Sequence, residues 1–168
     1  MIEKNNATKI VWLILEINNL LTKYGDYICQ GAGITTQQWL IMLYLAKDPN
    51  APYFKREKHD KPLMASELAD ALNVSRPNIT NLLNGLLKKG MVKQIPDEED
   101  RRKKRLELAP EGIKLLAKLE PGRKIFNDNL LERFSEEERA QFSDFLENCN
   151  ETIWSHFAKD FGLNDVDN

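Results

Sequence analysis

Few residues in this sequence are of the kinds that bind metals or carry out most enzymatic chemistry. It contains only two cysteines and two histidines, and His59 and His156 lie far apart with no acidic or thiol cluster near them. A zinc site needs four ligands at short characteristic spacings, which the sequence does not offer. Glycine-rich phosphate loops and the Gly-x-Ser-x-Gly and His-Glu-x-x-His patterns are missing as well. We therefore expect no metal, no cofactor and no enzymatic activity.

Long apolar runs are also missing. The most apolar stretch, residues 10–21, is interrupted by Glu16, Asn18 and Asn19, whereas a membrane-spanning helix needs about 20 apolar residues in a row. The stretch also lacks the basic start and small-residue cleavage site of a secretory signal. These features predict a protein that stays in the cytoplasm and does not enter a membrane.

Charge is unevenly distributed along the chain. The net charge is −2, yet residues 75–105 hold nine basic and four acidic residues. A basic segment on an acidic body is typical of a protein that binds a short stretch of DNA rather than coating it. The length suits one domain with helical extensions.

Two helices separated by a tight turn are predicted between residues 66 and 89. Ser66 is expected to cap the first helix, and Ser75 to cap the second, which ends before Gly90. The second helix carries an apolar stripe at helical spacing, made of Ile79, Leu82, Leu83, Leu86 and Leu87.

The opposite face of this second helix carries small polar side chains and bases. An asparagine amide can bond to an adenine edge, and a threonine offers a hydroxyl and a methyl group to the major groove. The candidate DNA contacts here are Ser75, Arg76, Asn78, Thr80, Asn81, Asn84, Lys88 and Lys89. A solvated helix with no ligand is the alternative, which the next segment disfavours.

A basic hairpin is predicted directly after the second helix. Residues 91–95 and 105–108 have strand-like patterns, and between them lie the acidic residues 97–100 followed by five bases, 101–105. Hairpin arginines can enter an adjacent minor groove, and Asp100 is close enough to Arg102 to orient its guanidinium. The candidate DNA contacts at the tip are Asp100, Arg101, Arg102, Lys103 and Lys104.

These segments resemble the MarR (multiple antibiotic resistance regulator) family. The most specific pattern is Asp97-x-x-Asp100-x-Arg102, followed by Leu108, Pro110 and Gly112. The pattern Thr36-x-Gln38-Trp39 resembles the start of the family's second helix, and the resemblance covers about residues 10 to 155. It implies a homodimeric winged helix-turn-helix transcription factor, often a repressor released by a small ligand or an oxidant.

The expected fold is mainly α with a small β-hairpin wing. We divide the chain into an N-terminal dimerisation helix in residues 1–34, a DNA-binding region in 35–112 and C-terminal dimerisation helices in 113–168. Within the DNA-binding region, residues 75–89 are the recognition helix and 91–109 the wing.

Two features depart from the family pattern. Ala109 stands where the family usually has threonine, so the following helix loses a side-chain cap, which Pro110 partly offsets by fixing φ. Residues 47–62 form an unusually long connection with three prolines. This segment is a plain loop, a contact to the DNA backbone or a cover for a ligand cleft.

Apolar stripes near both ends predict a dimer. Residues 10–28 have an apolar stripe and further apolar side chains elsewhere on the same helix, so this helix must be buried on more than one side. Residues 135–138 form a capping-box start, and an aromatic stripe follows in residues 142–161. Pairing of these helices between two subunits would bury both stripes, whereas in a monomer they would form an intramolecular cap.

Two modes of regulation remain open. A cleft lined by Tyr24, Tyr27, Trp39 and Met42 would suit a small aromatic or phenolic effector, although each residue also fits a core. Cys149 is expected to be a buried hydrophobe, and Cys29 is a weaker candidate for an oxidant sensor. The function hypothesis is a homodimeric repressor that binds a palindromic operator in double-stranded DNA, and the alternative is a winged-helix protein-interaction module.

Overall fold

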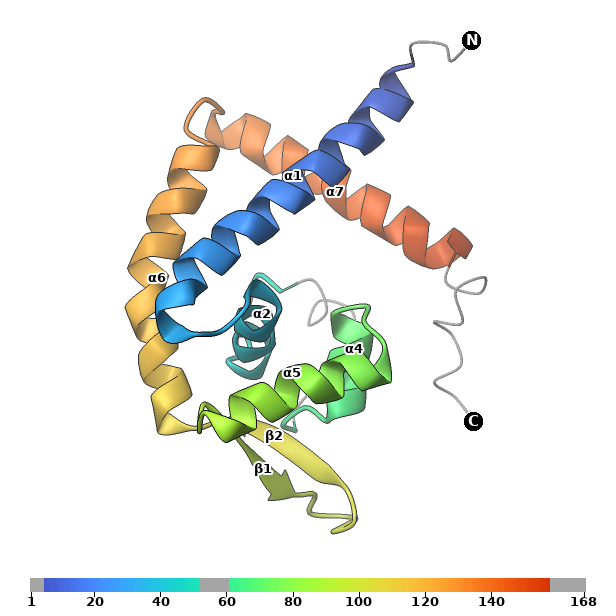
Figure 1. Ribbon diagram of the computed structural model, residues 1–168. Helices are drawn as coiled ribbons and strands as arrows, with labels where there is room; N and C mark the ends of the chain where they lie inside the picture. The colour runs from blue at the N-terminus through green and yellow to red at the C-terminus, as the bar shows by residue number, and fades with distance from the viewer. Residues whose placement is uncertain (1–4, 52–60, 158–168) are drawn as a thin grey trace. The chain divides into compact units, whose positions relative to one another are not determined.

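The computed structural model describes residues 5–51 and 61–157 (Figure 1). These residues fall into two compact units, with the division between Leu119 and Glu120. The first unit holds α1 (Asn6–Cys29), the short 3₁₀ helix η1 (Gln30–Ala32), α2 (Thr36–Leu45), α4 (Ala65–Ala71), α5 (Arg76–Lys88), β1 (Val92–Pro96), β2 (Lys104–Leu108) and the start of α6 (Pro110–Leu130). The second unit holds the rest of α6 and α7 (Glu136–Phe157). The expected fold, mainly helical with one hairpin, is confirmed. Most of the 47–62 connection and Phe161 of the aromatic stripe lie outside the described residues.

The core of the first unit lies between α2, α4, α5 and the hairpin. Ile79, Leu83 and Leu86 of α5 are buried, and Leu82 and Leu87 pack against the same cluster at its edge. The predicted stripe of α5 is therefore confirmed. The fully buried side chains of largest volume are Ile41, Met42, Leu68, Ile79, Leu86 and Cys29.

The start of α5 agrees with the sequence prediction, whereas the start of α4 does not. Ser75 caps α5, with its Oγ accepting a hydrogen bond from the Asn78 amide at 3.4 Å. The prediction that Ser66 caps α4 is wrong, because the N-cap residue is Met64, two residues earlier, and α4 begins at Ala65. The Glu67 carboxylate accepts the Met64 amide at 2.5 Å instead. Met64 is extended because it forms a β-bridge with Arg105 of the hairpin.

The hairpin is antiparallel and is tied to the helical part at its base. Val92 pairs with Leu108 at that end, and Pro96 pairs with Lys104 near the tip. The Leu106 amide donates to the Leu63 carbonyl at 2.8 Å. A Cβ at Gly112 would overlap the Met91 carbonyl, so the close approach of α6 to the hairpin explains the glycine in the family-like pattern.

The start of α6 agrees with the expectation drawn from the sequence. Pro110 is the first helical residue, where a proline loses no backbone hydrogen bond. The Ala109 carbonyl accepts from the Ile113 amide at 3.1 Å, so Ala109 occupies the N-cap position and has no side-chain oxygen to offer.

The second unit begins within α6 and turns into α7. Ser135 and Glu138 form the predicted capping box, with reciprocal bonds of 2.8 and 3.3 Å. Phe134 and Phe142 stack with their ring centroids 6.2 Å apart. The expectation that Cys149 is buried is wrong for the single chain, where Cys149 is exposed together with Phe145 and Ile153 of the same helix.

Candidate nucleic-acid interface

The exposed face of α5 carries the polar residues that the sequence singles out. Ser75, Arg76, Thr80, Asn81, Asn84, Lys88 and Lys89 are exposed, and Asn78 is half-buried. The Thr80 hydroxyl donates to the Arg76 carbonyl at 2.9 Å, so its methyl group and an oxygen lone pair remain available to a ligand. Asn81 and Asn84 lie one turn apart on the outer face. The face thus offers two amides close together and bases at both ends of the helix.

Arg76 at the start of α5 has a partner that the sequence did not suggest. Its Nη2 donates to Asp70 Oδ1 at 3.0 Å and to Oδ2 at 3.3 Å. Asp70 lies on α4, six residues earlier, and this spacing across a turn follows no helical or strand period. The pair is largely exposed and holds the guanidinium beside the N-terminus of α5.

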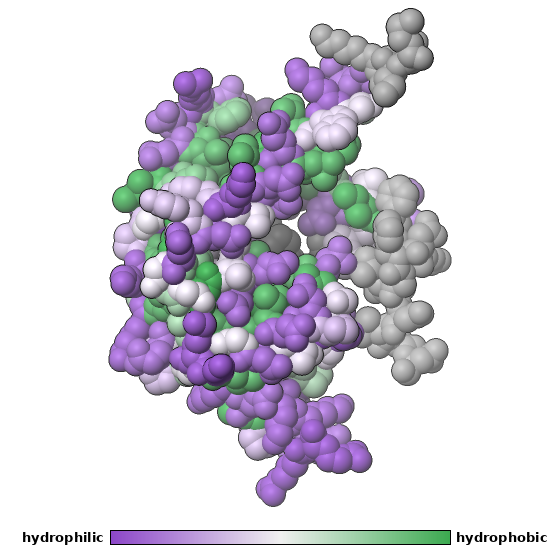
Figure 2. Space-filling model, viewed as in Figure 1, coloured by the Kyte–Doolittle hydropathy of each residue, from purple (hydrophilic) through white to green (hydrophobic). Residues whose placement is uncertain are grey.

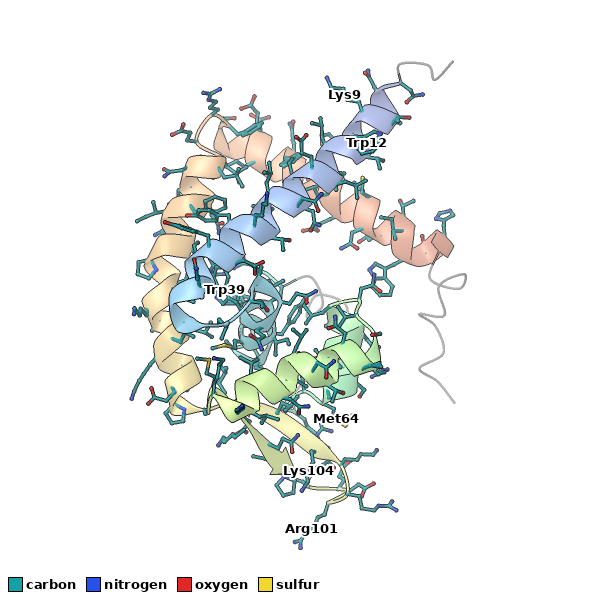
Figure 3. All side chains as sticks on the ribbon, viewed as in Figure 1. Lys9, Trp12, Trp39, Met64, Arg101 and Lys104 are labelled. Carbon is teal, nitrogen blue, oxygen red and sulfur yellow. The ribbon has the colours of Figure 1, made fainter. Side chains whose placement is uncertain are left out.

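The tip of the hairpin presents a cluster of bases to solvent. Asp100 Oδ1 accepts from Arg102 Nε at 3.1 Å and from the Arg102 amide at 3.1 Å, so the predicted ion pair is confirmed. Hydrogen bonds from the Arg102 side chain and amide lower the pKa of Asp100. Arg102 is 91% exposed, while Arg101, Lys103 and Lys104 are exposed beside it. Figure 3 shows Arg101 and Lys104 projecting from the hairpin, and in Figure 2 this region is a mostly hydrophilic lobe.

The fifth base of the run has a different role from the other four. Arg105 is only 14% exposed and forms an ion pair with the buried carboxylate of Asp97. Its Nη1 donates to the Pro62 carbonyl at 2.6 Å. Hydrogen bonds from the Asp100 amide and the Arg105 guanidinium lower the pKa of Asp97 from 3.8 to about 2. Arg105 therefore belongs to the base of the hairpin, and the exposed bases of the tip are the four that the sequence singles out, Arg101, Arg102, Lys103 and Lys104.

Strand alternation alone predicts the opposite orientation for Arg105. Arg105 is flanked by Lys104 and Leu106 in β2, and strand neighbours point to opposite faces. Arg105 nevertheless turns inward beside the buried Leu106 because Asp97, Glu67 and the Pro62 carbonyl supply the charge and hydrogen bonds that a half-buried guanidinium requires. No sequence pattern links Arg105 to these three residues.

The four candidate effector residues do not form one cluster. Trp39 and Met42 are part of the hydrophobic core, and Trp39 points into the interior in Figure 3. Tyr27 is 76% exposed and borders a shallow cavity at the end of α1 together with Asp26 and Gln30. Tyr24 is exposed one turn earlier on the same helix.

Another cavity, of about 490 Å³, has a lining that the sequence did not suggest. It lies between the end of α1 with η1, the segment after α5 and the first turns of α6. Apolar side chains such as Ile28 and Leu115 line it, and Lys89, Lys114 and Lys118 surround them. Lys114 is paired with Glu111 at 2.7 Å.

Cys29 has the properties of a core residue rather than of a redox sensor. Its side chain is fully buried, and burial raises its thiol pKa to about 11, with a further contribution from Asp26. A reactive cysteine needs access to solvent and a lowered pKa. The oxidant-sensing alternative through Cys29 thus has no support in the geometry.

Two other kinds of site are missing from the part of the chain that the structure describes. Within residues 5–51 and 61–157, no group of three or more metal-ligating side chains comes together. None of the helices described there is long and apolar enough to span a membrane.

Comparison with known proteins gives a consistent assignment for the middle of the chain. Residues 32–103 match the sequence model of the MarR family. The transcriptional activatory protein BadR of Rhodopseudomonas palustris is 29% identical over 106 residues, which are 63% of this chain and 55% of BadR. The HTH-type transcriptional repressor YetL of Bacillus subtilis is 28% identical over 133 residues, 79% of this chain and 74% of YetL. Both relatives are transcriptional regulators rather than enzymes.

Solved structures share the fold over most of the chain. The S. aureus MepR–DNA complex has a TM-score of 0.73 at 23% identity and covers 89% of this chain and 99% of MepR. The transcriptional regulator SlyA has a TM-score of 0.72 at 17% identity, and the match covers 86% of this chain and 93% of SlyA. The helical unit with its hairpin is therefore a winged helix-turn-helix fold, in which α5 is the second helix of the helix-turn-helix and β1–β2 the wing.

Proposed function

We propose that this chain, whose residues 32–103 match the sequence model of the MarR family, is a member of that family and regulates transcription by binding a specific DNA sequence. In this proposal α5 enters the major groove and the wing reaches the adjacent minor groove. The match with BadR spans about half of that protein, so this proposal rests on the residues of the site as well as on relatives.

The observation that carries the proposal is the pairing of two complementary surfaces on one compact unit. Asn81 and Asn84 are exposed on α5, and four bases are exposed at the tip of the wing, both within residues 1–119. Asparagine amides suit base edges, and clustered cations suit phosphates and a narrow minor groove. A protein-binding hot spot would instead be expected to be rich in tryptophan, tyrosine or arginine.

We further propose that the functional form is a homodimer that binds a palindrome. The first unit leaves an apolar surface on α1 in contact with solvent, and Trp12 is 70% exposed. The members of this surface are Ile10, Val11, Trp12, Leu13, Ile14, Leu15, Ile17, Leu20, Leu21 and Tyr24. Burial of apolar surface of this extent against a second copy is the main source of association free energy. Two recognition helices related by a two-fold axis would then read half-sites about 34 Å apart.

The direction of regulation that we propose is repression. Among the relatives, BadR is described as an activatory protein and YetL as a repressor. The match with YetL covers more of both chains than the match with BadR does. A dimer on an operator blocks transcription by occupying the site, and this requires no contact beyond the DNA interface.

A small effector would act through the cavity of about 490 Å³. Its apolar lining and surrounding lysines suit an aromatic ring with a carboxylate or phenolate group. Lys89, the C-cap residue of α5, is part of this lining. A ligand there would regulate DNA binding only if it preferred one position of α5 over another.

The direct test is fluorescence-anisotropy binding of the chain to the DNA upstream of its own gene, with a shuffled duplex as the control, at several salt concentrations. We expect affinity at least ~10³ higher for the upstream duplex, with two subunits per duplex. Equally weak binding to both duplexes, together with the absence of a bound site in a genome-wide pull-down, would favour a protein-interaction module instead.

A further inference from the structure

The recognition helix is hydrogen-bonded from behind by a buried glutamine of α2. Gln38 is 9% exposed, and its side-chain amide donates from Nε2 to the Leu82 carbonyl of α5 at 3.0 Å. Leu82 lies in the middle of α5, next to Asn81 and two residues before Asn84. A backbone carbonyl has two lone pairs, so Leu82 can accept this bond in addition to its bond within the helix.

A glycine in α5 makes this contact possible. A Cβ at Gly85 would overlap the Gln38 amide nitrogen. Glycine is unfavourable in the interior of a helix, and Gly85 is the only glycine within α5. The close approach of Gln38 therefore explains a residue that is otherwise costly at this position.

The other end of the same amide is fixed to the start of α2. The side-chain oxygen Oε1 of Gln38 accepts a hydrogen bond from the backbone N–H of Thr35 at 3.1 Å. The backbone N–H of Gln38 donates in return to Thr35 Oγ1 at 3.2 Å. With the oxygen held in this capping box, the nitrogen is directed at α5. The side chain thus has one orientation, in which each end of the amide has a partner.

The start of α2 is in turn attached to α1. The Thr36 amide and hydroxyl both donate to Asp26 Oδ1 at 2.7 Å, and the Thr36 hydroxyl also lies 2.9 Å from the Thr22 carbonyl. These bonds lower the pKa of Asp26. A continuous set of hydrogen bonds therefore joins α1 to α2, and Gln38 continues it to the middle of α5.

From this geometry we infer that Gln38 is a positioning residue for DNA recognition. Through its hydrogen bond to the Leu82 carbonyl, Gln38 fixes the position and the rotation of α5 relative to α1. The inference rests on the proposed DNA-binding function and deepens it. Gln38 does not touch DNA itself, and it acts on Asn81 and Asn84 through the helix turn that they share with Leu82. In a dimer built on α1, the same connection relates the two recognition helices to each other.

Two substitutions break this connection in different ways. Gln38→Glu keeps an oxygen for the Thr35 amide but removes the N–H that donates to Leu82. Gly85→Ala places a Cβ where the Gln38 amide lies, while alanine is the better helix former. The matched control is Thr35→Ala, which weakens the α2 cap and leaves the bond from Gln38 to Leu82 in place.

The test measures each variant on a duplex that the wild-type chain has selected from a random library, and on a shuffled version of it. Gln38→Glu and Gly85→Ala should each lower the ratio of selected to shuffled affinity about tenfold, which corresponds to the net contribution of one hydrogen bond at its upper range. Thr35→Ala should leave this ratio within about twofold of wild type, even where it lowers the melting temperature more than Gly85→Ala does.

The inference would be overturned if both Gln38→Glu and Gly85→Ala kept the wild-type ratio of selected to shuffled affinity. It would also be overturned if Thr35→Ala lowered this ratio as much as those two variants do. Amide hydrogen exchange of the free protein gives an independent result, because faster exchange is expected in the middle of α5 in Gln38→Glu but not in Thr35→Ala. A wild-type chain that selects no duplex would contradict the proposed function, and unchanged exchange in Gln38→Glu would contradict the role of Gln38 separately.

Discussion

The wing contains two Asp–Arg pairs whose environments differ, and we propose different roles for them. Asp100 and Arg102 lie at the exposed tip, where an ion pair contributes little to stability. Asp97 and Arg105 lie at the base, where the carboxylate is buried. We assign the first pair to DNA binding and the second to attachment of the wing, and this assignment can be tested residue by residue.

Arg102→Ala and Arg101→Ala remove the same charge from adjacent exposed positions. Arg102 is oriented by Asp100, so its loss should reduce affinity roughly tenfold on duplexes with A·T-rich flanks and less on G·C-rich flanks. Arg101→Ala should weaken binding to both duplexes equally. It should also reduce the slope of log affinity against log salt concentration by about 1 for each subunit. Anisotropy titrations on the two duplexes distinguish these effects, and an identical response of both variants would contradict the role of Arg102.

The Asp97 carboxylate predicts a pH dependence of stability. Its pKa is about 2 in the folded chain against an ordinary 3.8, so its contribution is fully present above about pH 4 and is lost as the pH falls toward 2. Asp97→Asn should lower the melting temperature at neutral pH and flatten its dependence on pH between these limits. Thermal unfolding from pH 2 to 7 measures this, with the exposed Asp144→Asn as the control, and parallel curves for wild type and Asp97→Asn would refute the prediction.

Among the elements, α5 shows how far sequence patterns reach. Its bounds, its Ser75 cap and its apolar stripe are local properties, and all three were predictable from spacing. The contact between Gln38 and Leu82 joins residues 44 positions apart, and no periodicity encodes it. The start of α4 was misplaced for a related reason, since Met64 is held by a bridge to the hairpin and local propensity favoured Ser66.

The N-cap of α6 offers a stabilising substitution. Ala109 lies where a threonine would accept a hydrogen bond from the first turn of the helix, so Ala109→Thr should raise the free energy of unfolding by about 1 kcal/mol. This corresponds to a rise of roughly 2–4 °C in the melting temperature. The contrasting substitution is Ser135→Ala at the start of α7, which should lower stability by about the same amount. An unchanged free energy of unfolding in Ala109→Thr would show that a side-chain cap does not stabilise the first turn of α6.

For the whole molecule, the sequence predicted the apolar stripe of α1 and the structure shows it in contact with solvent. In the proposed dimer the partner of this surface is a second chain, so the fold of one chain does not contain it. The same reasoning applies to Cys149, which was expected to be buried and is exposed. The sequence could therefore identify apolar surfaces that need to be buried, but it could not show which surface covers them.

A charged substitution on α1 tests the dimer. Ile17→Glu should convert a particle of twice 19.4 kDa into one of 19.4 kDa and should reduce operator affinity about a hundredfold or more, because the two half-sites are then bound independently. Gln37→Glu adds the same charge at an exposed position of α2, outside this apolar surface, and should change neither property. Sedimentation velocity and anisotropy measure both. A wild-type chain that sediments as a monomer, or an Ile17→Glu variant that remains dimeric, would refute the α1 interface.

In the proposed function, the chain reads a DNA sequence through α5 and the wing as a symmetric dimer. Selection of duplexes from a random library by the wild-type chain, followed by sequencing, tests this proposal. We expect enrichment of an inverted repeat whose half-sites lie about 10 base pairs apart, with A·T-rich flanks where Arg102 enters the minor groove. A selected pool that has the base composition of the starting library and contains no inverted repeat would refute this mode of DNA recognition.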